Sequence, residues 1–248
     1  MRKEKEVLFM QVFVPIWIAE AVCAALFILA GYPITTKKSF TFKMLSCVLY
    51  MANGLYAYSL SAKGAYGVTI LVGLAFGWLG DVFLALDPFV RHKQNRKLSL
   101  VLFVIGGFFF LLGHIAYMAA FLRLLLSAHA FRVLPFLLTW GGVLLCIALT
   151  FILCKVKAGK FFVPIAIYAA GLSGMCALAI CCAVLVFGGH TVTQCILIAA
   201  PLLFAFSDVT LALRSMDKER FESLTMRSIC LVPYFLAQML LGLSVWLA

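Results

Sequence analysis

With 248 residues, of which 65% are hydrophobic and only 12% are charged, the chain has more apolar surface than a water-soluble core of this size could bury. Its net charge of +11 would suit a nucleic-acid-binding protein, but the 20 Lys and Arg lie in the gaps between long apolar runs. That pattern is typical of a membrane protein, whose basic loops set its orientation and contact lipid head groups. Composition therefore excludes a soluble globular domain and predicts a polytopic membrane protein with no nucleic-acid partner.

Eight long apolar runs follow one another along the chain. A helix that crosses a bilayer needs about 20 mostly apolar residues, and each run is close to that length. The runs cover residues 8–30, 43–61, 65–86, 99–122, 133–154, 161–187, 192–213 and 228–247. Because the connections are short, residues 1–248 are predicted to form a single all-α domain, a bundle of about eight transmembrane helices.

Polar breaks between the runs support this division. The first run follows a basic N-terminus, but it extends to about Ala30 and ends without a cleavage site, which favours a spanning helix over a signal peptide. Gly, Pro and charged residues occupy most of the connections. The weakest break separates the fourth and fifth runs, where Arg123, His129 and Arg132 are the polar interruptions.

The nine cysteines give no sign of a disulfide framework or a metal site. They lie within or at the ends of apolar runs, without metal-ligand spacing. We expect free thiols that pack as small apolar residues, and neither a metal nor another cofactor.

The loop charges predict how the helices are oriented. With eight spans both termini lie on one side, and that side holds six of the 20 Lys and Arg: Arg2, Lys3, Lys5, Lys63, Arg123 and Arg132. The opposite loops hold the other fourteen. The positive-inside rule therefore places the termini in the lumen or exterior and the basic loops in the cytosol. Without a cleavable signal or a lipidation motif, the endoplasmic reticulum membrane is the expected location.

Acidic side chains inside the apolar runs are the first candidates for a functional site. A carboxylate in the bilayer interior is costly unless it is paired, hydrated or protonated. Of the nine acids, Glu20, Asp81 and Asp208 lie inside a run. Asp81 and Asp208 each precede the cytosolic end of their helix by about five residues, or about 8 Å. These two carboxylates are therefore predicted to share one depth.

Other polar residues fall in the same half of the membrane. They are Lys43, Tyr168, Tyr234 and Gln238, with His114 and Tyr117 deeper in the fourth helix. Tyr234 and Gln238 are four residues apart and share one helix face. Five glycines would let the helices approach closely at this level: Gly77, Gly80, Gly106, Gly107 and Gly113. Together they predict a polar pocket that opens toward the cytosolic leaflet around two carboxylates.

The same residues resemble the lysoplasmalogenase family of YhhN-like membrane proteins. The matching motifs are Gly80-Asp81-Val-Phe-Leu, Gly106 followed by His114 and Tyr117, Tyr168 followed by Met175, Ser207-Asp208-Val-Thr-Leu-Ala-Leu, and Tyr234-Phe-Leu-Ala-Gln238. They occur in order from the third helix to the last, and this order and spacing carry the resemblance. Two positions depart from the pattern, since Phe235 stands where a second tyrosine is familiar and Arg214 where an asparagine is familiar.

The resemblance implies an eight-helix hydrolase of lipid metabolism that acts in plasmalogen catabolism. It would cleave the vinyl-ether bond of lysoplasmalogens to a fatty aldehyde and glycerophosphoethanolamine or glycerophosphocholine. Its partners would be this lysophospholipid substrate and the surrounding membrane lipids. Nothing in the sequence predicts the oligomeric state.

The chemistry of a vinyl ether independently suits two carboxylates. Protonation of the β carbon gives an oxocarbenium ion, water then adds, and the hemiacetal collapses to an aldehyde and an alcohol. Two carboxylates in a low-dielectric pocket do not both ionise easily, so one retains a proton while the other stays charged. Glycosidases handle a similar cation with the same pair of groups. Asp81 and Asp208 are therefore predicted to divide the acid and water-activating roles, in an order left open.

The polar residues around the two aspartates are predicted to orient the carboxylates and the attacking water by hydrogen bonds: His114, Tyr117, Tyr168, Tyr234 and Gln238. Hydrogen bonds that only hold the helices together would explain these residues nearly as well. For the aspartates themselves, the cost of placing an acid in the membrane favours a functional role.

Three further residues have open roles. Lys43 would pair with an aspartate, hold the substrate phosphate or extend to the membrane interface. Ser207 is expected to be a hydrogen-bond partner instead of a nucleophile, because no Gly-x-Ser-x-Gly elbow surrounds it. Glu20 belongs to no matched motif, which favours a structural pair or a proton path.

A proton-coupled transporter of lipids or small molecules is the rival interpretation, because it would also need buried acids on several helices. Two features count against it: the halves show no clear inverted repeat, and both aspartates lie near one face instead of at the midplane. A non-catalytic scaffold would leave the buried acids unexplained.

Overall fold

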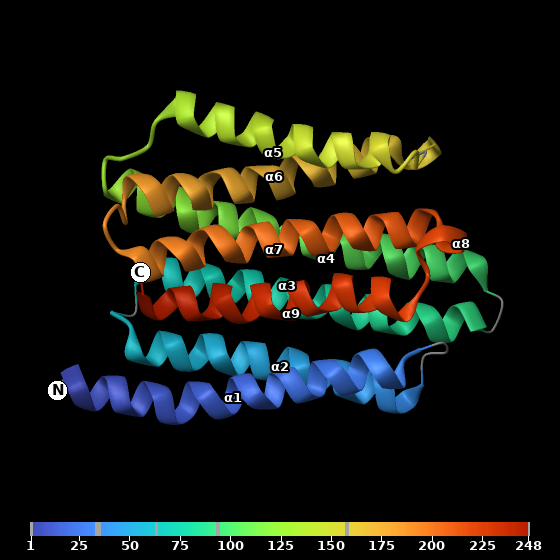
Figure 1. The fold of residues 1–248 in the computed structure, drawn as a ribbon, viewed down its shortest axis with the longest axis horizontal. Coiled ribbons are helices and arrows are strands. Elements are labelled where there is room, and N and C mark those ends of the chain that lie inside the picture. The colour runs from blue at the N-terminus through green and yellow to red at the C-terminus, as the bar shows by residue number, and fades with distance from the viewer. Residues whose placement is uncertain (1, 33–35, 63, 93–94, 157–158, 248) are drawn as a thin grey trace.

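The chain folds as a bundle of long helices that run side by side (Figure 1). The computed structural model describes residues 2–32, 36–62, 64–92, 95–156 and 159–247, and within them there is no strand. The long helices are α1 (Arg2–Ala30), α2 (Lys37–Leu60), α3 (Ala65–His92), α4 (Arg96–Ser127), α5 (Val133–Leu153), α6 (Phe162–Leu185), α7 (Thr191–Met216) and α9 (Leu224–Leu247). A short 3-10 helix (Gly159–Phe161) and α8 (Lys218–Phe221) lie in connections.

The long helices coincide with the eight predicted runs, and the weakest predicted break does separate α4 from α5. The second helix begins earlier than predicted, at Lys37 instead of residue 43. Thr36 caps it, because the hydroxyl accepts a hydrogen bond from the backbone nitrogen of Ser39 at 3.1 Å. Lys43 therefore lies inside α2 instead of at its start.

The fold is an all-α polytopic membrane bundle, as predicted. Within the residues that the structure describes, seven helices are long and apolar enough to cross a membrane, namely α1 over residues 11–30, α3, α4, α5, α6, α7 and α9. The remaining long helix, α2, has the same length as α6 but falls short in hydropathy. It buries the polar side chains of Lys43, Ser46 and Asn53, so its polar face is turned into the bundle.

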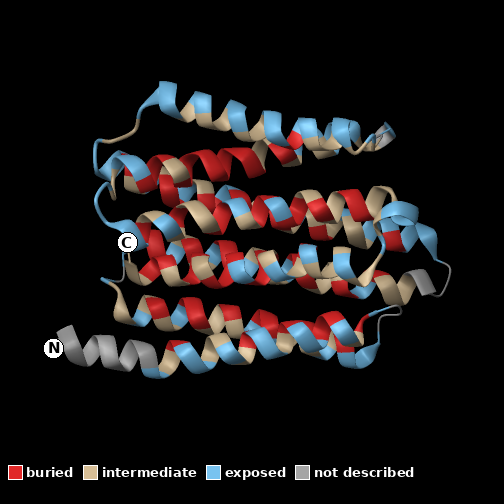
Figure 2. Ribbon diagram, viewed as in Figure 1, coloured by how far each residue is buried: buried red, intermediate tan, exposed pale blue. Residues whose placement is uncertain are grey.

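Helix α9 lies at the centre of the bundle, where it packs against α1, α2, α3 and α7. Buried residues face one another in the interior, and exposed apolar residues cover the outside (Figure 2). Helix α5 lies at one edge, packs mainly on α6 and buries only Ile147 (Figure 1). All nine cysteines fall in described parts of the chain and are free thiols, as predicted.

Four of the five predicted glycines lie at close helix contacts: Gly77, Gly80, Gly106 and Gly113. A Cβ on Gly80 would stand 2.8 Å from the ring of Phe110 and 3.0 Å from the carbonyl oxygen of Gly106. Any side chain there would push α3 and α4 apart. The prediction is wrong for Gly107, where an added Cβ would meet no atom within 4 Å.

Glu20 is buried in α1, next to Ser46 of α2. Its side chain is 4% exposed, and neither carboxylate oxygen makes a hydrogen bond in the described part of the chain. The hydroxyl of Ser46, on the neighbouring helix α2, is likewise buried and unpartnered. Ser46 is therefore the neighbour with which the expected structural pair would form, and the expected proton path stays a prediction.

Replacing Glu20 by methionine is expected to stabilise the protein by about 1 kcal/mol, because methionine fills a similar volume without an unpaired polar group. Thermal unfolding of the purified protein in detergent measures the effect. Glu219→Met, at an exposed position, controls for the added apolar atoms. A midpoint lowered by Glu20→Met alone would mean that this carboxyl group takes part in an interaction or a proton path that the protein needs.

Candidate functional site

A cavity of about 460 Å³ opens at the end of the bundle away from both termini, where α8 lies (Figure 1). Asp81 from α3 and Asp208 from α7 both line it, together with Lys43, Ser207 and Tyr234. Its volume falls in the usual range of small-molecule sites, about 300–1,000 Å³. The two intramembrane aspartates therefore face one shared opening.

Asp81 is held by a buried ion pair and three hydrogen-bond donors. The Nζ of Lys43 lies 2.9 Å from its Oδ1, and both side chains are almost fully buried. Its Oδ2 accepts hydrogen bonds from the Oη of Tyr234, from the Oη of Tyr50 at 3.3 Å and from the Sγ of Cys47 at 3.4 Å. These contacts supply only donors and a positive charge, which suits a carboxylate that carries its negative charge.

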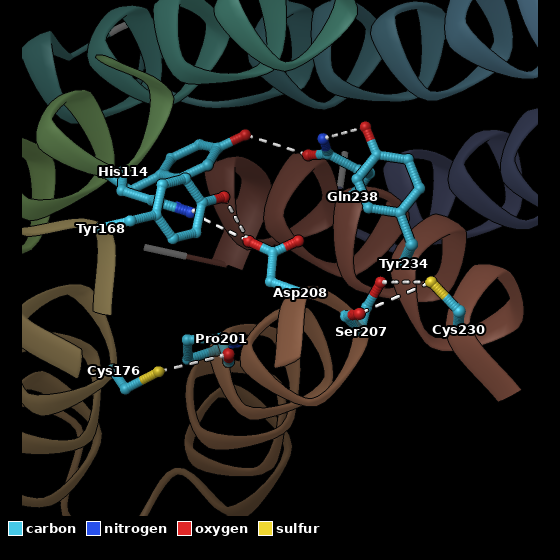
Figure 3. Close-up of polar contacts among 10 residues, drawn as sticks. His114, Tyr168, Cys176, Pro201, Ser207, Asp208, Cys230, Tyr234 and Gln238 are labelled. Atoms are coloured by element: carbon cyan, nitrogen blue, oxygen red, sulfur yellow. Dashed lines mark hydrogen bonds and ion pairs between the residues drawn. The ribbon is translucent and has the colours of Figure 1, made fainter. Parts of the chain in front are cut away.

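A chain of hydrogen bonds continues from Asp81 into the interior. The Nε2 of Gln238 donates to the Oη of Tyr234 at 2.9 Å, and the Oη of Tyr117 donates to the Oε1 of Gln238 at 3.0 Å (Figure 3). Gly77 makes room for it, because a Cβ there would stand 2.6 Å from the Nε2 of Gln238. Three of the predicted pocket residues are thus joined to Asp81: Tyr234 lines the cavity, and Gln238 and Tyr117 lie behind it.

Asp208 has different partners. Its Oδ2 accepts a hydrogen bond from the Oη of Tyr168 at 2.5 Å and lies 3.2 Å from the Nε2 of His114 (Figure 3). The Nδ1 of His114 is buried and unpartnered, which favours the ring proton on Nε2, where Asp208 can accept it. The other oxygen of Asp208, Oδ1, makes no hydrogen bond with a described residue and points away from His114 and Tyr168. Asp208 lines the cavity, and one of its two oxygens has no partner among the described residues.

Ser207 precedes Asp208 but makes its contacts elsewhere. Its Oγ lies 3.9 Å from the Sγ of Cys230, and that thiol donates to the backbone oxygen of Ser207 at 3.5 Å (Figure 3). Ser207 is thus a partner of Cys230, and the structure shows no hydrogen bond between its hydroxyl and the neighbouring aspartate among the described residues. Among the residues that the structure describes, no group of three His, Cys, Asp or Glu side chains could hold a metal ion.

Sequence reasoning misses two partners of Asp81, namely Cys47 and Tyr50. They follow Lys43 by four and seven residues on α2, so the three side chains share one helix face. This spacing is the signal that could have found them. It is a weak one, because cysteine and tyrosine at helical spacing are also common in ordinary membrane helices.

Two arginines also line the cavity near its mouth, Arg214 toward the end of α7 and Arg227 at the start of α9. The Nη2 of Arg214 donates to both carboxylate oxygens of Glu222, at 2.9 and 3.1 Å. The guanidinium of Arg227 lies 4.8 Å from the centre of the Phe27 ring. From the sequence, Arg214 is noticed only as a departure from a family pattern, and Arg227 is not noticed at all.

Comparison with protein families supports the family resemblance. A model described as the YhhN family matches residues 38–245, a range that includes both aspartates and all the side chains that contact them. Searches of curated proteins and of solved structures find no match.

Proposed function

The chain belongs to the YhhN family, which includes lysoplasmalogenases, and from this premise we propose that it hydrolyses the vinyl-ether bond of lysoplasmalogens. The products would be a fatty aldehyde and glycerophosphoethanolamine or glycerophosphocholine. The observation that carries the proposal is the placement of two carboxylates with different partners on one cavity inside a membrane bundle. That arrangement suits a reaction that needs both a proton donor and a stabiliser of positive charge.

In this proposal Asp208 acts as the proton donor. Its Oδ2 is occupied by Tyr168 and His114, so a proton on the available Oδ1 would face the cavity. Transfer of this proton to the β carbon forms a C–H bond from the double-bond electrons and leaves an oxocarbenium ion. The Asp208 carboxylate then takes a proton from the water that adds to the α carbon. The hemiacetal collapses as its hydroxyl proton moves to the ether oxygen, which leaves as the alcohol.

Asp81 has the complementary role. Lys43, Tyr234, Tyr50 and Cys47 hold its carboxylate in place, so its negative charge can stabilise the oxocarbenium ion without moving. The Tyr234 hydroxyl lies on the cavity wall beside it and would help to position the attacking water. Tyr117 and Gln238 orient that hydroxyl from behind.

The rest of the cavity suits a single hydrocarbon chain. Apolar side chains from six helices complete its lining, including those of Phe27, Phe40, Leu84, Phe103, Leu211 and Leu231. We place the mouth on the cytosolic side of the endoplasmic reticulum membrane, because the more basic set of loops lies at this end of the bundle.

Aldehyde release by the purified protein tests the proposal directly. We expect release from a lysoplasmalogen and none from the matching 1-O-alkyl lysophospholipid, because a saturated ether has no double bond to protonate. A folded protein that binds the lysoplasmalogen but releases no aldehyde would contradict hydrolysis. Movement of intact lipid across proteoliposomes would then favour a transporter.

A further inference from the structure

Three buried polar groups near the mouth of the cavity have no partner in the described part of the chain. They are the Nε atoms of Arg214 and Arg227 and the Oγ of Ser39. All three residues line the cavity that contains both aspartates, and Ser39 and Arg214 are at least nine-tenths buried. Buried polar groups are normally hydrogen-bonded, so a cluster of free donors in a cavity points to a ligand rich in acceptors.

Arg227 contributes most to this cluster. It makes no ion pair and no hydrogen bond with any described residue through its Nε, and its guanidinium lies over the ring of Phe27. Glu222 is the acid that acts on Arg227, but Arg214 already donates to both oxygens of that carboxylate, so two partly buried guanidinium groups share one negative charge. The remaining positive charge is unfavourable, and an anionic ligand would satisfy it. Arg214 differs because Glu222 holds its Nη2, yet its Nε still has no acceptor.

Gly31, which directly follows α1, brings two of these groups together. A Cβ at this position would stand 2.3 Å from the Nη2 of Arg227 and 2.5 Å from the Oγ of Ser39. The guanidinium and the hydroxyl are therefore neighbours that occupy the space beside the glycine. Any larger residue would displace one of them.

The spacing along the helices matches a glycerol backbone. On α9, Arg227 precedes Tyr234, the partner of Asp81, by seven residues, or about 10 Å. On α7, Arg214 follows Asp208 by six residues, or about 9 Å. In a lysoplasmalogen seven bonds separate the phosphorus from the β carbon of the vinyl ether, about 8 Å when extended. A phosphate held by the arginines would therefore put the reacting carbon at the level of the aspartates.

We propose that Arg227, Arg214 and Ser39 bind the phosphodiester of the lysophospholipid head group and so set the depth at which the vinyl ether enters. This inference rests on the proposed function for the identity of the lipid. Arginine suits the task, because its planar fork binds phosphate oxygens through two parallel hydrogen bonds. Lys43, the residue considered for this role from the sequence, is instead engaged by Asp81 at 2.9 Å.

Binding of two ether lipids that cannot be hydrolysed tests the subsite apart from catalysis. 1-O-Alkyl-glycerophosphoethanolamine carries the phosphate, and 1-O-alkylglycerol lacks it. For the wild-type protein in nanodiscs we expect the phosphate-bearing lipid to bind at least about ten-fold tighter than the alkylglycerol. The quenching of tryptophan fluorescence measures the binding of each lipid. Arg227→Gln should remove most of this preference and Arg214→Gln part of it. Gly31→Ala should also reduce it without any change of charge, while alkylglycerol binding stays unchanged in each folded variant.

Arg220→Gln is the matched control, because Arg220 pairs with Asp217 at 2.5 Å and lies outside the cavity lining. Equal binding of the two lipids by the wild type, or a preference that survives Arg227→Gln, would overturn the proposal. Inorganic phosphate that displaces the lysolipid at similar concentrations would assign the subsite to free phosphate and also overturn it. If the protein prefers the phosphate-bearing lipid but releases no aldehyde from a lysoplasmalogen, only the proposed reaction is refuted. If it releases aldehyde but shows no such preference, only the phosphate subsite is refuted.

Discussion

The Asp208→Asn variant is expected to release aldehyde about 10³-fold more slowly than the wild type, within the usual range for loss of a general acid. Asparagine has nearly the shape of aspartate, and its oxygen can still accept the hydrogen bond from Tyr168. It cannot deliver a proton to the β carbon from the position of Oδ1. Initial rates of aldehyde release from a lysoplasmalogen at saturating substrate measure the effect.

Asp217→Asn provides the control for this variant, since Asp217 lies in the connection to α8, pairs with Arg220 and does not line the cavity. It should keep the wild-type rate. Both variants should unfold near the wild-type temperature, which shows that a lost rate is not a lost fold. If Asp208→Asn kept more than about a tenth of the wild-type rate, Asp208 would not be the proton donor.

Asp81→Asn should lower both stability and activity. The substitution leaves the Lys43 ammonium buried without its counter-charge, and breaking a buried ion pair from one side costs about 3–5 kcal/mol. It also removes the charged acceptor of Tyr234 and Tyr50. Thermal unfolding and aldehyde release, measured on the same preparation, report the two effects.

A second substitution separates the structural part of this effect from the catalytic part. Lys43→Met combined with Asp81→Asn removes both charges, so most of the lost stability should return. Aldehyde release should stay at least about 10²-fold below the wild type, because no fixed negative charge remains to stabilise the cation. Recovery of the rate along with the stability would show that the Lys43–Asp81 pair only holds α2 and α3 together.

Most of the fold could be predicted because hydropathy reports directly on contact with lipid. The runs identified as spans coincide with long helices, even at the weak break before α5. Helix α2 shows the limit of this signal. Its interior face carries Lys43, Ser46 and Asn53, so its average hydropathy describes its packing inside the protein more than its contact with lipid. Hydropathy does not predict the start of α2 either, because the capping threonine and the two lysines that follow it are polar.

The candidate site could be predicted only in part. Asp81 and Asp208 stand out because an acid in a membrane helix is rare and costly. Their partners do not stand out, because the contacts depend on which helices are neighbours. Lys43 reaches Asp81 because α2 packs beside α3, and Tyr234 reaches it because α9 occupies the centre of the bundle. The periodicity of a single helix does not predict which other helices pack against it.

The hydrogen bonds that lead to Asp81 all run in one sense. Tyr117 donates to Gln238, Gln238 donates to Tyr234, and Tyr234 donates to the carboxylate. The dipoles of these side chains therefore add, with every proton directed toward the same negative charge. The bundle solvates this charge much as water would, but with dipoles that are already oriented before any substrate arrives and need no reorganisation when a cation forms beside them.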